Sequence, residues 1–185
     1  MPVYLYVIVG VVVLAAIWVV LIFNHLVRLS NEAKRGWSNI DVQLKRRTDL
    51  IPNLVEAVKG YAAHEREVFE AVTAARVAMQ QATGPAQAGA ANKQASAALG
   101  RLFAVAEAYP ELKANIGFQQ LQQELTNTED RIAAGRRFYN ANVRELNTKI
   151  EIFPTNVIAG MFGFTKAEYF EVDDQAVRTT PEVKF

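Results

Sequence analysis

The segment KRRTDLIPNLVEAV, residues 45–58, places three basic side chains and a proline within one amphipathic pattern. Apolar residues recur every three or four positions, and this phase is kept on both sides of Pro52, which predicts an α-helix. A proline inside a helix removes one backbone hydrogen bond and costs about 3 kcal/mol. We expect a kinked helix that continues through Pro52. The alternative is a break at which Asn53 is the N-cap and Glu56 completes a capping box.

The same apolar stripe extends in both directions from this segment. Starting from Leu26 and moving along the chain by four and then three residues, thirteen of the sixteen positions reached are apolar. The sixteen are Leu26, Ser30, Ala33, Trp37, Ile40, Leu44, Arg47, Ile51, Leu54, Val58, Tyr61, Glu65, Val68, Val72, Ala75 and Met79. A strand has a period of two and cannot produce this spacing, which is typical of helices packed nearly parallel or antiparallel. The pattern therefore predicts an all-α chain.

The segments that follow divide the chain further. Residues 80–94, QQATGPAQAGAANKQ, combine two glycines and a proline and predict a loop. A short Ala-rich helix should follow and end at Tyr109, because the residue before a proline disfavours helical backbone. The last long helix carries a large apolar residue at every seventh position: Phe118, Leu125, Ile132, Tyr139, Leu146 and Phe153.

Two arrangements fit these elements. If GYAAHE, residues 60–65, divides the first stripe, the chain forms four helices joined up and down; if not, it forms one long hairpin of kinked helices. In both, an even number of antiparallel passes returns Phe153 to the end from which residue 24 departs.

Residues 1–23, MPVYLYVIVGVVVLAAIWVVLIF, contain no ionisable side chain. As a helix, residues 2–23 would be about 33 Å long, which matches the thickness of the bilayer hydrocarbon. A cleaved signal peptide is disfavoured because no basic residue precedes the apolar run. A buried core helix would seldom run this long without a polar position. We therefore expect one transmembrane helix, and no later run is long enough for a second.

The flanks of this run predict its orientation. Residues 24–47 carry two acidic side chains and six basic ones: Arg28, Lys34, Arg35, Lys45, Arg46 and Arg47. Lys and Arg are retained on the cytoplasmic side, so we expect the N-terminus outside and the remainder of the chain in the cytoplasm of a bacterial cell, at the inner membrane.

A second uncharged stretch, IFPTNVIAGMFGF, lies at residues 152–164 and is too short to span a bilayer. It has two interpretations. Either it folds onto the bundle and covers the membrane-proximal end, or it is an interfacial segment whose Phe162 and Phe164 dip into the lipid headgroups.

Two charged residues fall on the apolar stripe, Arg47 and Glu65. Such residues often fix helix register through a partner, and the last long helix offers candidates. These are Glu124, Glu129, Arg131 and Arg136. We single out Arg47, Glu65, Glu129 and Arg136; the alternative is that the long side chains reach past the stripe to water.

The sequence contains no recognisable constellation for catalysis. It has no cysteine and only three serines, and His64 in HEREV lacks the second histidine of a zinc-binding HExxH helix. Glycine-rich phosphate loops and nucleophile elbows are also missing. The net charge is only +1 and the bases are interleaved with acids, which argues against nucleic-acid binding. We therefore expect no enzymatic activity, no metal and no cofactor.

Three long segments carry a family resemblance. They are LVRLSNEAKRGWSNIDVQLKRRTDLIPNLVEAVKGYAAHE, YPELKANIGFQQLQQELTNTEDRIAAGRRFYNANVRELNTKIEIFP and NVIAGMFGFTKAEYFE. In these segments the chain resembles the LemA family of bacterial membrane proteins. The resemblance implies an N-terminal single-pass anchor followed by an antiparallel up-and-down four-helix bundle with long helices, and it supports a break near Gly60. It supplies no catalytic or metal-binding positions, and one branch of the family is associated with building internal membrane compartments in magnetic bacteria.

On this basis we divide the chain into an anchor (1–23), a helical bundle (24–164) and a C-terminal tail (165–185). We expect a membrane-anchored scaffold that contacts the lipid bilayer, copies of itself and other membrane proteins. These contacts would be made by helix faces, and no reactive groups would be required. The alternative is a ligand-sensing or adaptor bundle tethered to the membrane.

Overall fold

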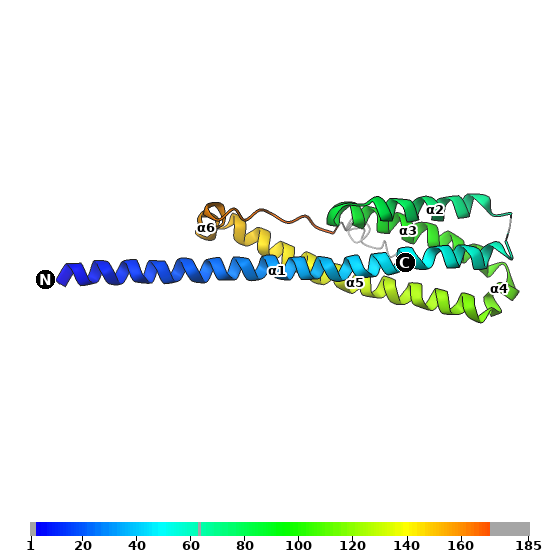
Figure 1. The fold of residues 1–185 in the computed structure, drawn as a ribbon, viewed down its shortest axis with the longest axis horizontal. Helices are drawn as coiled ribbons and strands as arrows, with labels where there is room; N and C mark the ends of the chain where they lie inside the picture. Colours follow the sequence, from blue (N-terminus) through cyan, green and yellow to red (C-terminus); the bar gives the residue numbers. More distant parts are fainter. Residues whose placement is uncertain (1–2, 63, 171–185) are drawn as a thin grey trace, which may run out of the picture. The chain divides into compact units, whose positions relative to one another are not determined.

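The computed structural model describes residues 3–62 and 64–170, and every regular element in these ranges is a helix (Figure 1). The predicted all-α class is therefore confirmed. Residues 171–185, most of the predicted tail, lie outside the described residues.

Helix α1 spans Val3–Lys59 and includes Pro52. The expectation that the helix continues through the proline is confirmed, and the alternative break at Asn53 is wrong. The stripe is buried at most of its positions as far as Val58. Tyr61, which follows the helix, is exposed because the chain turns at Gly60 and Tyr61, as the GYAAHE segment predicts.

Helix α2 spans Arg66–Gln81 and α3 spans Gly84–Glu107. The loop predicted for residues 80–94 is wrong, since only Ala82 and Thr83 separate the two helices. Gly84 has a φ of 79°, which glycine adopts readily, and Pro85 occupies the first turn of α3, where proline is tolerated. The glycine and the proline therefore start a helix instead of extending a loop. Alanine and glutamine, which favour helices, fill much of the first three turns.

Helix α4 is short, Pro110–Ala114, and α5 spans Ile116–Glu151. Tyr109 has an extended backbone, as expected for a residue before proline. Of the heptad series, Phe118, Leu125, Ile132, Tyr139 and Leu146 are buried. Phe153 is a correction: α5 has already ended, and its side chain is 77% exposed.

Helix α6 spans Thr155–Met161, within the uncharged stretch. Gly163 follows with a φ of 72°, and the backbone N–H of Phe164 donates to the Ala159 carbonyl at 2.9 Å. An extended segment then runs to Phe170, whose side chain is buried.

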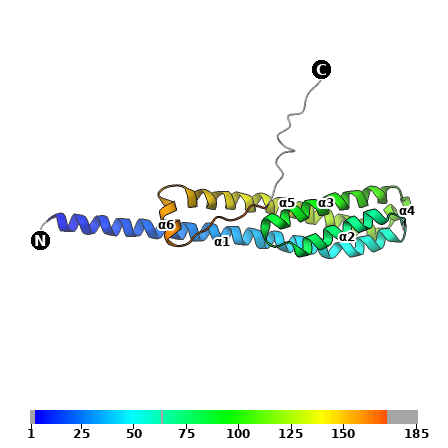
Figure 2. The same cartoon turned by 90° about the horizontal axis from the view of Figure 1, so that it is seen from above.

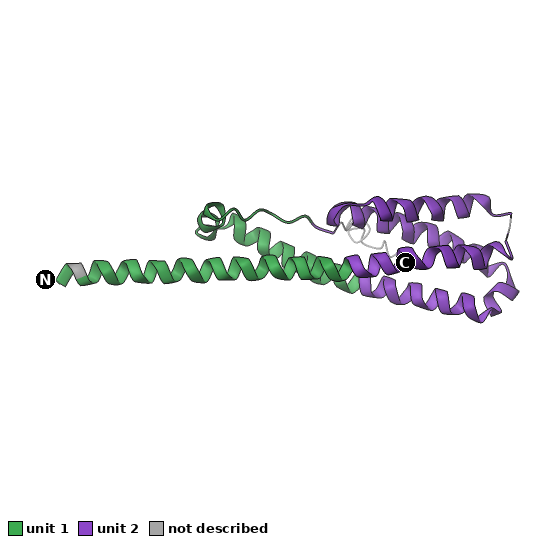
Figure 3. Ribbon diagram, viewed as in Figure 1, with its two compact units in different colours: residues 1–40, 133–168 green, residues 41–132, 169–185 purple. Residues whose placement is uncertain are grey.

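The chain forms two compact units (Figure 3). Unit 1 comprises residues 1–40 and 133–168. In it, the first part of α1 and the last part of α5 run antiparallel, because His25 faces Glu145 and Ile40 faces Gly135. A Cβ atom on Gly135 would lie 3.0 Å from the Ile40 side chain, so the two helices approach closely here and a larger residue would require that side chain to shift.

Unit 2 comprises residues 41–132 and 169–185, and contains the rest of α1 and α5 together with α2, α3 and α4. Figure 2 shows these helices lying alongside one another. Their apolar faces share one core, to which each of the five helices contributes. Its best-buried members include Leu54, Val58, Val72, Ala95, Leu102 and Leu112.

The apolar start of α1 is the candidate membrane span. Of the helices in the described residues, α1 alone is long and apolar enough to cross a membrane, and none of its most apolar window is buried against protein. Apolar side chains at positions 3, 4 and 6–21 are instead largely exposed. A surface of this size would be expensive in water, which favours lipid as its surroundings.

Candidate functional site

Arg47 lies in the interior of unit 2, with 4% of its side chain exposed. Its Nη1 donates to Glu129 on α5 and, at 2.8 Å, to Oδ1 of Asn92 on α3. Burial lowers the pKa of Arg47, while the Glu129 carboxylate acts in the opposite direction. One buried charge therefore links three helices through hydrogen bonds.

Other polar groups extend this network. Ser96 on α3 donates to the same Glu129 oxygen at 3.4 Å. Gln43 Oε1 and Arg47 Nε are buried and have no hydrogen-bond partner among the described protein atoms. By contrast Arg46, its neighbour on α1, pairs with Glu124 on the surface at 2.5 Å.

A second polar contact compensates for Pro52. Proline has no backbone N–H, so the carbonyl of Thr48, four residues earlier, lacks its usual helix donor. Nε of Arg76 on α2 donates to this carbonyl at 3.3 Å. The Thr48 hydroxyl donates to the Leu44 carbonyl at 2.8 Å.

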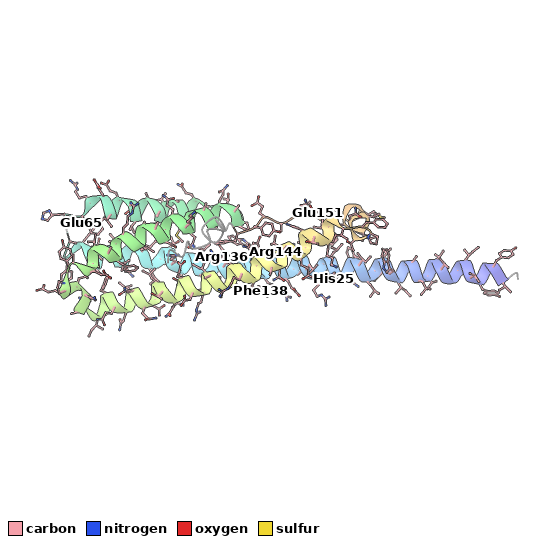
Figure 4. All side chains as sticks on the ribbon, turned by 180° about the vertical axis from the view of Figure 1, so that it is seen from behind. His25, Glu65, Arg136, Phe138, Arg144 and Glu151 are labelled. Carbon is pink, nitrogen blue, oxygen red and sulfur yellow. The ribbon has the colours of Figure 1, made fainter. Side chains whose placement is uncertain are left out.

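The other two singled-out polar residues lie in different units (Figure 4). Glu65 is partly exposed directly before α2, and its N–H donates to the Ala62 carbonyl at 3.1 Å. Arg136 is partly exposed on α5 in unit 1. The structure thus brings Arg47 and Glu129 together and places Glu65 and Arg136 at separate, partly solvated positions.

The two candidate interfacial residues lie against the end of the apolar run in unit 1. The ring centroid of Phe23 is 4.7 Å from that of Phe162 and 5.9 Å from that of Phe164. We call these three residues the anchor-proximal cluster. Leu26, Leu29 and Leu146 continue it toward α5, and Ile158 and Ala159 bury one face of α6 against them.

Polar contacts hold the segment after α6 against α5. The Tyr139 hydroxyl donates to the Glu168 carbonyl at 2.6 Å. Asn147 both donates to the Ala167 carbonyl and accepts from the Ala167 N–H, each at 2.9 Å. Burial, and then the charge of Glu168, raise the pKa of Tyr139 to about 12.

Sequence reasoning missed several of these groups. Asn92 lies within the segment predicted to be a loop. Arg76 has no neighbouring sequence pattern that indicates its contact with the Thr48 carbonyl. The heptad series predicts Tyr139 only as an apolar, buried residue. A tyrosine in a series of aliphatic and phenylalanine side chains is a signal of a buried hydroxyl that needs a partner.

The surface of unit 2 also carries a groove of about 320 Å³, lined by Lys59, Arg66, Phe69 and Glu70. The Lys59 ammonium lies 6.0 Å from the centroid of the Phe69 ring. Within the described residues, no group of three or more His, Asp or Glu side chains could hold a metal ion.

Comparison with known proteins gives two kinds of match. The sequence pattern of the LemA family matches residues 36–185. The chain is 30% identical over 175 residues to magnetosome protein MamQ 2 of Paramagnetospirillum magneticum, covering 80% of this chain and 64% of that protein. It is 28% identical over 174 residues to magnetosome protein MamQ of Magnetospirillum gryphiswaldense, with the same shares covered.

A further relative is protein LemA of Metamycoplasma hominis, 29% identical over 167 residues, which cover 84% of this chain and 75% of that protein. The chain spans less than two thirds of the length of the magnetosome relatives it matches. Because the family pattern covers most of the sequence, the chain belongs to the LemA family.

Proposed function

We propose that this protein is a membrane-anchored helical scaffold. Residues 1–23 cross the inner membrane of a bacterial cell with the N-terminus outside, and the remainder lies in the cytoplasm. The single observation that carries the proposal is the continuity of α1, in which an exposed apolar segment passes without interruption into a helix packed in a core. Such a helix joins a lipid-facing surface to a protein-facing one.

In this proposal the helices of unit 2 form an antiparallel up-and-down four-helix bundle, made of α1, α2, α3 and α5. Their shared core supports this arrangement. The protein functions by binding copies of itself or other membrane proteins through its helix faces. No catalysis, metal or cofactor is involved. A role in organising or shaping a membrane is what the family resemblance implies, and two of the relatives are named as magnetosome proteins.

Exposed apolar side chains on the packed part of the chain are candidate contacts for self-association. Phe138 on α5 is 55% exposed and can be seen in Figure 4. Arg144 is an exposed residue on the same helix, about 120° away around its axis, and offers a matched polar position.

Cross-linking in native membranes tests the scaffold. A photoreactive phenylalanine analogue replaces Phe138 in the full chain, and the same analogue at Arg144 is the control. We expect an adduct between two chains, or with a membrane protein, at position 138 and a weaker one at 144. A chain that stays monomeric at both positions, with no partner captured at any expression level, would contradict the scaffold.

A further inference from the structure

Helix α6 and its flanks expose apolar side chains on a segment without charge. No ionisable residue occurs between Glu151 and Lys166. Ile158 and Ala159 are buried, yet large apolar side chains on the other faces are at least half exposed. These are Ile152, Phe153, Val157, Met161 and Phe162. A helix covering the end of a bundle in water would place polar residues on these faces.

This apolar surface is continuous with the end of the candidate membrane span. Phe162 and Phe164 contact Phe23. Val19, Ile22, Phe23 and Phe164 all pack against the buried residues that join α1, α5 and α6, among them Leu26 and Ile158. All of these residues belong to unit 1. If residues 2–23 cross the hydrocarbon, the helix turn from Val19 to Phe23 lies at its boundary with the headgroups. Contact with this turn sets α6 at the same depth.

The charge of unit 1 beyond the span is suited to a membrane surface. Residues 24–40 and 133–168 contain four acidic side chains and eight basic ones, a net charge of +4. The basic residues are Arg28, Lys34, Arg35, Arg136, Arg137, Arg144, Lys149 and Lys166. Basic side chains near a bilayer are attracted to anionic headgroups.

We propose that α6 and its flanks, residues 152–164, form an interfacial lipid-binding surface embedded in the anionic leaflet at which α1 leaves the membrane. This inference rests on the membrane anchoring in the proposed function. The buried face of α6 holds it to α1 and α5, and its exposed apolar side chains enter the boundary between headgroups and acyl chains. The chain is then fixed to the bilayer at two points, which restricts its tilt and rotation.

Site-directed spin labelling measures this depth directly. The chain has no cysteine, so each label reports a single introduced position. Met161→Cys and Val157→Cys place labels on exposed side chains of α6 and leave the anchor-proximal cluster intact. Val13→Cys, within the span, is the lipid control, and Ala141→Cys, exposed on α5 in unit 1, is the water control. The full chain is studied in nanodiscs of phosphatidylcholine and phosphatidylglycerol. The collision rate of each label with oxygen is compared with its collision rate with a nickel chelate.

We expect both α6 labels to favour oxygen over nickel, between the Val13 and Ala141 values, at about 5–10 Å below the headgroup boundary. If the Val13 label is in lipid but the α6 labels match Ala141, the interfacial surface is refuted while the anchor stands. Labels shielded from both reagents would show that protein covers α6, which also refutes it. A water-exposed Val13 label would instead overturn the anchoring itself. Unchanged circular dichroism confirms that each labelled chain is folded.

Discussion

Arg47 is a charged residue placed among apolar ones. It and its partner Glu129 differ in solvent exposure, and this difference has a measurable consequence. Its own side chain is buried, whereas the Glu129 side chain is 44% exposed. Glu129 can therefore recover hydration when it loses its partner, but Arg47 cannot. Removing one member of a buried pair is costly when it leaves the other charge buried and unpaired.

The first prediction is an asymmetry between two substitutions. Glu129→Ala should lower the free energy of unfolding by about 3 kcal/mol, because it strands the buried guanidinium. Arg47→Met, which replaces the charge by an apolar side chain of similar length, should cost less, about 1–2 kcal/mol, chiefly because the buried Asn92 side chain loses its donor. Denaturant unfolding of the full chain in detergent, followed by circular dichroism, measures both values.

The surface pair Arg46 and Glu124 is the matched control. Both side chains are at least 41% exposed, so Glu124→Ala and Arg46→Met should each change stability by no more than about 1 kcal/mol. Equal costs for Glu129→Ala and Arg47→Met would show that burial of Arg47 does not govern the network.

The second prediction concerns Tyr139. Its pKa is raised from 10.0 to about 12, so the folded state favours the neutral phenol. The stability that follows is fully present below pH 10 and is lost as the pH rises through 12, because the unfolded chain releases this proton first. Tyr139→Phe should cost about 1 kcal/mol at pH 8 through loss of the bond to the Glu168 carbonyl. The difference in free energy of unfolding between the unmodified chain and the Tyr139→Phe chain should shrink above pH 10.

The two chains should be compared by denaturant unfolding at each pH. The other five tyrosines and all lysines are common to both chains, so their titration cancels in the difference. A constant difference from pH 8 to 11.5 would show that Tyr139 is not the titrating group.

At the scale of the element, helix α1 tolerates Pro52 because another helix supplies the missing donor. The stripe on both sides of the proline is buried, so tertiary packing holds the helix together. Arg76 on α2 satisfies the Thr48 carbonyl that the proline leaves without a backbone partner. The proline and the arginine are therefore coupled across two helices.

The third prediction is a double-substitution cycle on this coupling. Arg76→Met alone should lower the free energy of unfolding by about 1–2 kcal/mol, because the Thr48 carbonyl loses its donor. In a Pro52→Ala background the alanine N–H supplies that donor, and Arg76→Met should cost less. Thermal and denaturant unfolding of the four chains gives the coupling free energy. A cost that is the same in both backgrounds would rule out the proposed compensation.

At the scale of the whole molecule, the chain combines an exposed apolar segment, the candidate membrane span, with packed helices. Charge is distributed to match: residues 1–23 have none, and the next part of unit 1 is net positive. A membrane anchor of this kind is sensitive to charge at its centre, where an arginine costs about 2.5–3.5 kcal/mol.

The fourth prediction tests the anchor. Val12→Arg with Val13→Arg should move much of the protein from the membrane pellet to the supernatant after extraction at alkaline pH, because both charges would lie near the bilayer centre. The control, Val42→Arg with Val77→Arg, alters two exposed valines outside the span and should leave the protein in the pellet. Equal extraction of both chains would contradict a transmembrane role for residues 1–23.

The sequence predicted those parts of the fold that depend on nearby residues. The apolar period from Leu26 to Val58 identified the buried face of α1, and the phase across Pro52 favoured a helix that continues, which the structure confirms. The prediction failed at residues 80–94 because composition does not tell whether Gly84 and Pro85 end a helix or begin one. It also failed at Phe153, because the heptad continued for one step after the helix had ended.

By itself, then, the sequence determined the all-helical class, the course of α1 and most of α5 with their buried faces, and the apolar segment, since these follow from backbone hydrogen bonding and hydropathy along a few turns. Only the tertiary structure decided which side chains meet. Glu129 is 82 residues from Arg47, and Asn92 is 45 residues from it. The physical reason is that a contact between helices depends on the direction of two side chains and the path of the chain between them. Neither is encoded within a few turns.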